Sequence, residues 1–261
     1  MRYVLTLAVL LVALAVVRPE ATQPVYVQVA LYDIVPDMGG AFEKALVESQ
    51  ARLVEQRGFL EERVLRNLDP LAAQYATYTK FTETAAASDA MRNRLSVLAW
   101  LCRRAPEVHL TRMLKAYDAL PETDAGATAA PAPHKGRIAH LGLFIPYPKY
   151  RGQYDQVLDE VKTFIRDRRP AGYLGEETAV EVNDSPWPQT PYSPRPRELS
   201  AMSINYGEYT SLENAENAYT NRHNRPKDPK IVVMERLFFS ALQVPTRFYL
   251  FEVTDRVARF H

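Results

Sequence analysis

The sequence is short of the residues on which several common kinds of site depend. Its 261 residues include one cysteine, Cys102, so no internal disulfide can form and no zinc site can be built on cysteine pairs. The 32 Lys and Arg residues nearly balance the 31 Asp and Glu residues, and a net charge of +1 argues against nucleic acid as a partner. There is no glycine-rich phosphate loop, G-x-S-x-G elbow, H-E-x-x-H motif or metal-ligand spacing. We therefore expect no metal and no bound cofactor.

The first residues of the chain form an apolar stretch, Tyr3 to Val17, which only Thr6 interrupts. As a helix these residues would span about 22 Å, less than the roughly 30 Å hydrocarbon core of a bilayer. This favours a secretory signal over a full membrane span, but the small residues that a cleavage site needs are poorly placed. Residues 1–21 are therefore predicted to be a signal peptide or an uncleaved anchor, which would touch the membrane through residues 2–18. Either segment predicts an extracytoplasmic protein that is secreted, periplasmic or membrane-anchored.

The rest of the chain, 47% hydrophobic and 24% charged overall, is typical of a globular protein and contains an internal duplication. Residues 27–32 and 139–144, 112 positions apart, both have the pattern of a strand. A helix with a matching apolar face follows each strand, and a glycine ends each helix, Gly58 and Gly172. The matching faces are Phe42, Ala45, Leu46, Ser49 and Leu53 in the first half, and Tyr154, Val157, Leu158, Val161 and Ile165 in the second.

The duplication continues to the end of each half. Residues 75–82 match residues 203–210, which aligns Tyr78 with Tyr206. We expect a second helix at 85–104 and at 212–224, and a final strand at 109–117 and at 231–240. The second half also carries an insertion at 183–197 that contains five prolines, and residues 121–136 are predicted to be a linker.

Each half therefore has the β-α-β-β-α-β order of a ferredoxin-like unit. Such a unit leaves one face of its sheet uncovered, and two units can cover each other. The predicted fold class is α+β, with two tandem ferredoxin-like units at residues 25–120 and 137–251. Their antiparallel sheets are expected to face each other as an α/β barrel.

The first half resembles the antibiotic-biosynthesis-monooxygenase (ABM) family of the dimeric α/β-barrel superfamily. The resemblance depends on the strand 27–35 before Pro36, the helix 42–56, the turn 57–60 and the junction 78–83. It implies relatives among cofactor-free oxygenases of aromatic polyketides and among haem-degrading enzymes. The haem-degrading pattern is mostly missing, because Ala30 and Gly142 stand in the asparagine register and Phe81 and Tyr209 at the tryptophan position.

Alternation along the first strand of each half separates two faces. We expect Val27, Val29, Leu31, Leu141 and Leu143 to lie under the helices. The other face carries small, polar and aromatic residues, as the lining of a ligand cavity between the sheets would. Its members are Gln28, Ala30 and Tyr32 in the first half, and His140, Gly142 and Phe144 in the second. A filled barrel, in which these residues only satisfy one another, is the alternative.

The candidate catalytic residues are His140, whose ordinary pKa lies near neutrality, and Tyr206. The candidate ligand-binding residues, chosen for a small aromatic ligand, are Gln28, Tyr32, Tyr78, Phe144 and Asn205. Trp187 and Tyr192, in the proline-rich insertion, are candidates for docking a protein partner or for a lid. Two functions remain open: an exported ABM-like monooxygenase or aromatic-ligand binder, and a non-catalytic accessory or scaffold subunit of an extracytoplasmic or membrane assembly.

Overall fold

The computed structural model describes residues 23–69, 74–118, 136–168, 170–182, 201–216, 229–243 and 247–258. The predicted signal or anchor, residues 1–21, and the insertion at 183–197 lie outside these ranges. Among the described residues, no helix is both long and apolar enough to cross a membrane.

The first half contains four strands and two helices in the predicted order. They are β1 (Tyr26–Tyr32), α2 (Gly39–Val54), β2 (Phe59–Asn67), β3 (Tyr75–Phe81), α3 (Thr84–Leu98), the 3-10 turn η1 (Ala99–Leu101) and β4 (Glu107–Asp118). The strands are arranged side by side as β4-β1-β3-β2, and every pair is antiparallel.

The second half repeats this arrangement as β8-β5-β7-β6. Its elements are β5 (Ile138–Phe144), the 3-10 turn η2 (Pro148–Tyr150), α4 (Arg151–Arg168), β6 (Tyr173–Glu181), β7 (Ser203–Tyr209), α6 (Pro229–Ser240) and β8 (Arg247–Ala258). Residues 212–216 are helical, as predicted for the start of the second helix of this half.

The prediction of a final strand at 231–240 is wrong, because these residues form α6. The run Ile231-Val232-Val233 is typical of a strand, but the tertiary packing of the segment follows a helical period. Met234 and Phe238, four residues apart, point inward, and the ring of Phe238 stacks on Tyr154 of α4 at 5.0 Å. The final strand of the second half is β8, twelve residues long like its counterpart β4.

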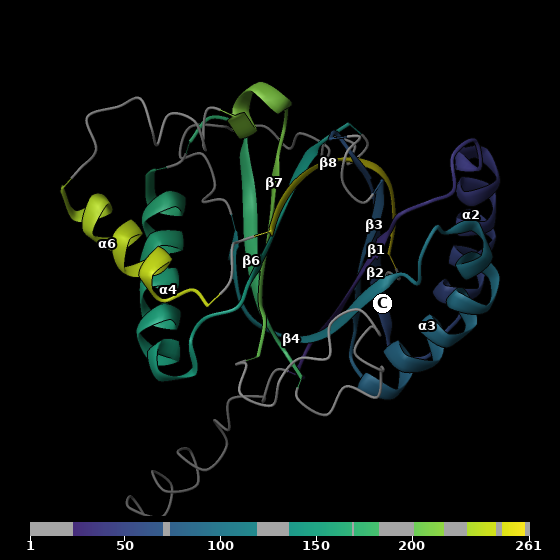
Figure 1. The fold of residues 1–261 in the computed structure, drawn as a ribbon, viewed down its shortest axis with the longest axis horizontal. Helices are drawn as coiled ribbons and strands as arrows, with labels where there is room; N and C mark the ends of the chain where they lie inside the picture. Colours follow the sequence, from purple (N-terminus) through teal and green to yellow (C-terminus); the bar gives the residue numbers. More distant parts are fainter. Residues whose placement is uncertain are drawn as a thin grey trace, which may run out of the picture.

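The two four-stranded sheets join into one closed barrel of eight strands. β2 pairs with β8 and β6 pairs with β4, so each half supplies one strand to each of the two junctions. Helices α2 and α3 cover one side of the barrel, and α4 and α6 cover the opposite side (Figure 1). The predicted fold class, two ferredoxin-like units with facing sheets, is confirmed.

The matching helix ends have the geometry that their glycines predict. Gly58 after α2 and Gly172 after α4 have φ values of +80° and +68°, a region that residues with a Cβ rarely adopt. Upstream, Phe42, Leu46 and Leu53 of α2, and Tyr154, Val157 and Leu158 of α4, are buried against the sheet.

The assignment of the two sheet faces is the reverse of the prediction. Val27, Val29 and Leu31, together with Leu141 and Leu143, face the barrel interior, where residues of both halves form one apolar cluster. Gln28, Ala30 and Tyr32 face α2 and α3, while His140, Gly142 and Phe144 face α4 and α6. Alternation separates the faces but does not show which one is inside, because helices bury one face as fully as the opposite sheet buries the other.

Candidate functional site

The barrel interior holds two tyrosines at equivalent positions of the two halves. Tyr78 of β3 and Tyr206 of β7 stack with ring centroids 4.1 Å apart and an interplanar angle of 22°. The hydroxyl of Tyr78 donates to Glu177 at 2.7 Å, and that of Tyr206 donates to Glu208 at 2.8 Å. Burial and the neighbouring carboxylates raise the pKa of both phenols well above the ordinary value. Both tyrosines are therefore neutral hydrogen-bond donors at neutral pH.

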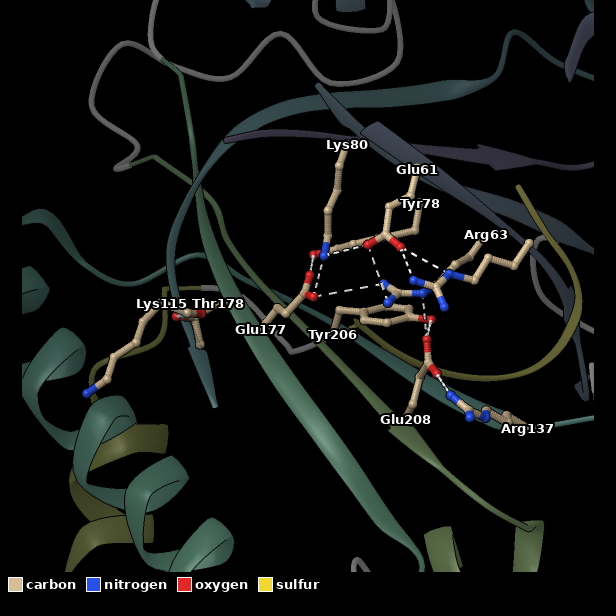
Figure 2. A network of polar contacts seen from close by, with 11 residues as sticks. Glu61, Arg63, Tyr78, Lys80, Lys115, Arg137, Glu177, Thr178, Tyr206 and Glu208 are labelled. Atoms are coloured by element: carbon tan, nitrogen blue, oxygen red, sulfur yellow. Dashed lines mark hydrogen bonds and ion pairs between the residues drawn. The ribbon is translucent and has the colours of Figure 1, made fainter. Parts of the chain in front are cut away.

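Charged side chains surround the tyrosine pair inside the barrel (Figure 2). Arg63 lies over the Tyr206 ring at 5.1 Å and forms an ion pair with Glu208, its Nε 2.7 Å from Oε1. Lys80 bridges Glu61 at 2.7 Å and Glu177 at 2.5 Å. Two further arginines pair with these carboxylates, Arg137 with Glu208 and Arg256 with Glu61. Four cations thus face three carboxylates, and the net charge of these seven side chains is 4 − 3 = +1.

The charges in this network are opposite at equivalent positions of the two halves. Arg63 is the cross-strand partner of Tyr78, and Glu177 is the cross-strand partner of Tyr206. Two residues after each tyrosine, the first half has Lys80 and the second has Glu208. At these positions the first half therefore supplies two cations and the second half two carboxylates, which pair across the barrel.

The ion pairs favour the charged form of two of these carboxylates, Glu61 and Glu208. Burial alone would raise the pKa of Glu61, but Arg63 and Lys80 outweigh it and lower the value to about 2. The pKa of Glu208 is also lowered, because Arg63, Tyr206 and Arg137 oppose the effect of burial. A general base needs a pKa near the working pH, so Glu61 and Glu208 are poor candidates for that role.

A second buried polar cluster lies on the helix-covered face of the second half. His140 of β5 has no exposed surface, and its Nε2 lies 3.3 Å from the Asn205 amide and 3.6 Å from Oε1 of Glu176. Lys162 of α4 pairs with Glu176 at 2.5 Å. With its amide oriented so that both ends are satisfied, Asn205 also accepts a hydrogen bond from Lys162 at 2.6 Å. The cluster combines an imidazole, a carboxylate, an ammonium and an amide out of contact with water.

The imidazole of His140 needs a glycine beside it. A Cβ at Gly207 of β7 would lie 2.4 Å from Cε1 of His140 and 2.7 Å from Cγ of Glu176. Phe248 of β8 stacks on the imidazole, with centroids 5.5 Å apart and an interplanar angle of 20°. The position of the ring is thus fixed by close packing as well as by polar contacts.

The first half has a buried polar cluster at the equivalent place, but its side chains differ from those around His140. Glu62 of β2 is fully buried at the position equivalent to Glu176, and Arg94 of α3 binds both of its oxygens, at 2.5 and 2.9 Å. Thr79 donates to the same carboxylate at 2.7 Å. Gln28, the equivalent of His140, donates to the Ala87 carbonyl instead. Among the described residues, the buried carboxylate at this position therefore lies beside an imidazole in the second half and not in the first.

The structure brings together some of the predicted site residues and separates others. Tyr78 meets Tyr206 inside the barrel, and His140 meets Asn205 under α4. The remaining predicted ligand-binding residues lie elsewhere in helix-facing packing: Gln28 against α3, Tyr32 against Phe42, and Phe144 against Phe238. Trp187 and Tyr192 lie outside the described residues. The expected convergence of Gln28 and His140 between the sheets is wrong, since each faces the helices of its own half.

Sequence reasoning missed the charged residues of both clusters. The unused signal was the run Glu61-Glu62-Arg63, with its counterpart Glu176-Glu177, which begins three or four residues after the glycine that ends each helix. Adjacent charged residues in a strand buried on both faces must find partners on both faces. Lys162 gave a similar signal, since it interrupts the apolar face of its helix.

No family model matches the sequence, and no curated protein matches it. Solved structures resemble the fold over nearly its whole length. An anthrone oxidase-like protein superposes with a TM-score of 0.64 at 12% identity, covering 91% of this chain and 94% of that one. A proposed monooxygenase of Fusobacterium nucleatum superposes with a TM-score of 0.62 at 8% identity, covering 91% and 96%. A proposed chlorite dismutase reaches 0.53 at 7% identity, covering 90% and 96%.

The chain has the dimeric α/β-barrel fold. The resemblance predicted from the sequence is confirmed at this level, with both halves of the barrel in one polypeptide. At these identities the likeness is one of fold alone.

The described residues at the asparagine and tryptophan registers of the haem-degrading pattern leave no room for haem there. Phe81 and Tyr209 fill the tryptophan register with fully buried rings packed against Phe59 and Tyr173. At the asparagine register of the second half, the ring of Phe144 covers Gly142 so closely that a Cβ there would lie 2.5 Å from it.

Proposed function

We propose that this protein binds a planar aromatic substrate on the helix-covered face of its second half and oxidises it with dioxygen. The observation that carries the proposal is the buried cluster of His140, Glu176, Lys162 and Asn205. An imidazole beside a carboxylate can accept a proton, and a buried ammonium can stabilise the anion that results. The names of the structural neighbours, an anthrone oxidase-like protein and proposed monooxygenases, support the same class of reaction.

The proposed reaction begins with removal of a proton from an activated aromatic CH₂ group. His140 takes the proton and shares it with Glu176, and Lys162 faces the developing anion. Dioxygen then oxidises the carbanion. The carbon loses two hydrogens and gains one oxygen atom as a carbonyl, and the other oxygen atom leaves as water.

Oxygen uptake by the purified full-length protein tests the proposal, with anthrone-type aromatics, which carry the required CH₂ group, as substrates. His140→Gln places in the second half the residue that the first half carries at the equivalent position, Gln28, and we expect uptake to fall by about 10²-fold or more. Arg92→Ala changes an exposed side chain on α3 and is the control. Equal uptake by His140→Gln and the unsubstituted protein would refute the role of His140.

The filled barrel interior favours a second candidate, a non-catalytic scaffold subunit. The tyrosine stack and its ion pairs occupy the space that a ligand between the sheets would need. In this case the insertion at 183–197, with Trp187 and Tyr192, would dock a protein partner. Isolation of the protein from its native membrane or medium tests this candidate: a stoichiometric set of partners with no small ligand supports it, and a bound aromatic refutes it.

We also propose that the folded part lies outside the cytoplasm, anchored by residues 2–18 or released after cleavage near residue 21. The apolar run Tyr3 to Val17 supports this location. Mass spectrometry of the N-terminus of the purified protein distinguishes the anchor from the cleaved signal. Intact protein found free in the cytoplasm would refute both.

A further inference from the structure

Among the described side chains that contact the buried imidazole of His140, one is exposed to solvent. Among the described residues in contact with His140, the polar partners Asn205 and Glu176 are buried, and so is Tyr209. Phe248 differs, because 42% of its surface is exposed while its ring stacks on the imidazole. A path from solvent to His140 through the described residues therefore passes through the position of this ring.

Exposure of a single phenylalanine is ordinary and carries no meaning by itself. The exposure of Phe248 matters because its ring covers the imidazole of His140. The stacked geometry, 20° between the planes and 5.5 Å between the centroids, is one that any planar aromatic ring could reproduce against the imidazole. A ring with one exposed side can also change rotamer without opening the core behind it.

We propose that Phe248 is the specificity-determining residue of the His140 site, and that a planar aromatic ligand binds by replacing the Phe248 ring on the imidazole. The class of ligand in this proposal, a planar aromatic, rests on the proposed function. The covering of the His140 imidazole by the Phe248 ring does not depend on that function. Swinging away about the Cα–Cβ bond moves the Phe248 ring into solvent and bares one face of His140. A flat aromatic ligand regains the lost stacking, whereas a saturated ring of similar size is too thick to do so. Phe248 thereby selects planar over non-planar ligands.

The cover is tested by chemical modification of the full-length protein, which needs no turnover. Diethyl pyrocarbonate modifies accessible imidazoles, and peptide mass spectrometry reports each of the five histidines separately, so that the other four serve as an internal reference. A lost aromatic stack corresponds to a change of up to about tenfold. We expect Phe248→Ala and Phe248→Leu to raise the modification rate of His140 by about that factor. Phe239→Ala, which removes a more exposed phenylalanine on α6, should leave the rate unchanged.

The selection is tested in the same assay with two probes, 2-naphthol and its saturated analogue decahydro-2-naphthol. In the unsubstituted protein, 2-naphthol should slow modification of His140 and the saturated alcohol should not. An unchanged rate in both Phe248 variants overturns the cover, and equal protection by the two alcohols overturns the selection. Faster modification in the variants together with selective protection by 2-naphthol supports the proposal even if no oxygen is consumed, in which case the oxidase proposal alone fails.

Discussion

Replacing Arg63 with methionine removes the cation at the centre of the barrel network. The Arg63 guanidinium lies 2.7 Å from Glu208, 3.4 Å from Glu61 and 3.9 Å from Glu177, and it covers the ring of Tyr206. Removing one partner of a buried ion pair costs about 3–5 kcal/mol, because the other charge is left without compensation. Glu208 keeps Arg137 at 3.3 Å and Glu177 keeps Lys80, so we expect the lower end, about 3 kcal/mol. That is a large part of the roughly 5–15 kcal/mol that stabilises a typical domain.

The assay is urea unfolding at neutral pH, followed by far-ultraviolet circular dichroism. Adding Glu208→Gln to Arg63→Met removes the carboxylate that has lost its nearest cation, while an amide oxygen still accepts from Tyr206. The double variant should therefore recover about 2 kcal/mol relative to the sum of the single variants. Arg92→Ala breaks an exposed pair with Asp89 and should change the free energy of unfolding by less than about 0.5 kcal/mol. A loss below about 1 kcal/mol in Arg63→Met, or strict additivity in the double variant, would refute the reasoning.

Three further predictions concern groups around the two clusters. Arg94→Met leaves the fully buried Glu62 without its cation, so it should cost about 3–5 kcal/mol in the same urea assay, and a loss no larger than that of Arg92→Ala would contradict this. Gly207→Ala should displace His140 and cost about 1–3 kcal/mol, with a shifted imidazole signal in NMR spectra; an unmoved signal would show that the close approach is unimportant. The folded pKa of Glu61, about 2, lies below its ordinary 4.5, so its stabilisation is full above about pH 4.5 and is lost as the pH falls toward 2. Urea unfolding across that range should show a smaller loss for Glu61→Gln than for the unsubstituted protein, and parallel curves would count against this.

The order of strands and helices could be predicted from the sequence because the same pattern occurs twice in the chain. A strand pattern, a helix face and a glycine recur at nearly constant spacing, and each copy makes the other less ambiguous. The insertion at 183–197 disturbs that spacing, so the repeat no longer fixes where the last strand of the second half falls, and the strand predicted at 231–240 is a helix. The stacking of Phe238 on Tyr154, which decides that this segment is helical, depends on a contact 84 residues away.

The candidate site was predictable only where one sheet brings its members together. His140 and Asn205 lie on the neighbouring strands β5 and β7, with Gly142 opposite Asn205, so a correct pairing of strands places them close to each other. Lys162 comes from a helix, and nothing in the local sequence fixes which carboxylate it reaches. Predicting the interior network would require the packing of the two sheets against each other, because Arg63 and Glu208 belong to different halves and meet only in the closed barrel.

The reversal of charge at these interior positions makes the two halves complementary to each other. Tyr78 and Tyr206 are alike, so the stack by itself would suit two identical halves as well as two different ones. The flanking positions favour two different halves. Two copies of the first half would bring Arg63 and Lys80 twice, with Glu61 as the one carboxylate that each copy supplies to this network. Two copies of the second half would bring Glu177 and Glu208 twice. Buried like charges are strongly unfavourable, whereas the observed pairing joins Arg63 to Glu208 and Lys80 to Glu177. The interior charges at these positions therefore favour the pairing of unlike halves. The helix-covered faces differ as well, with the imidazole of His140 in one half and the amide of Gln28 in the other.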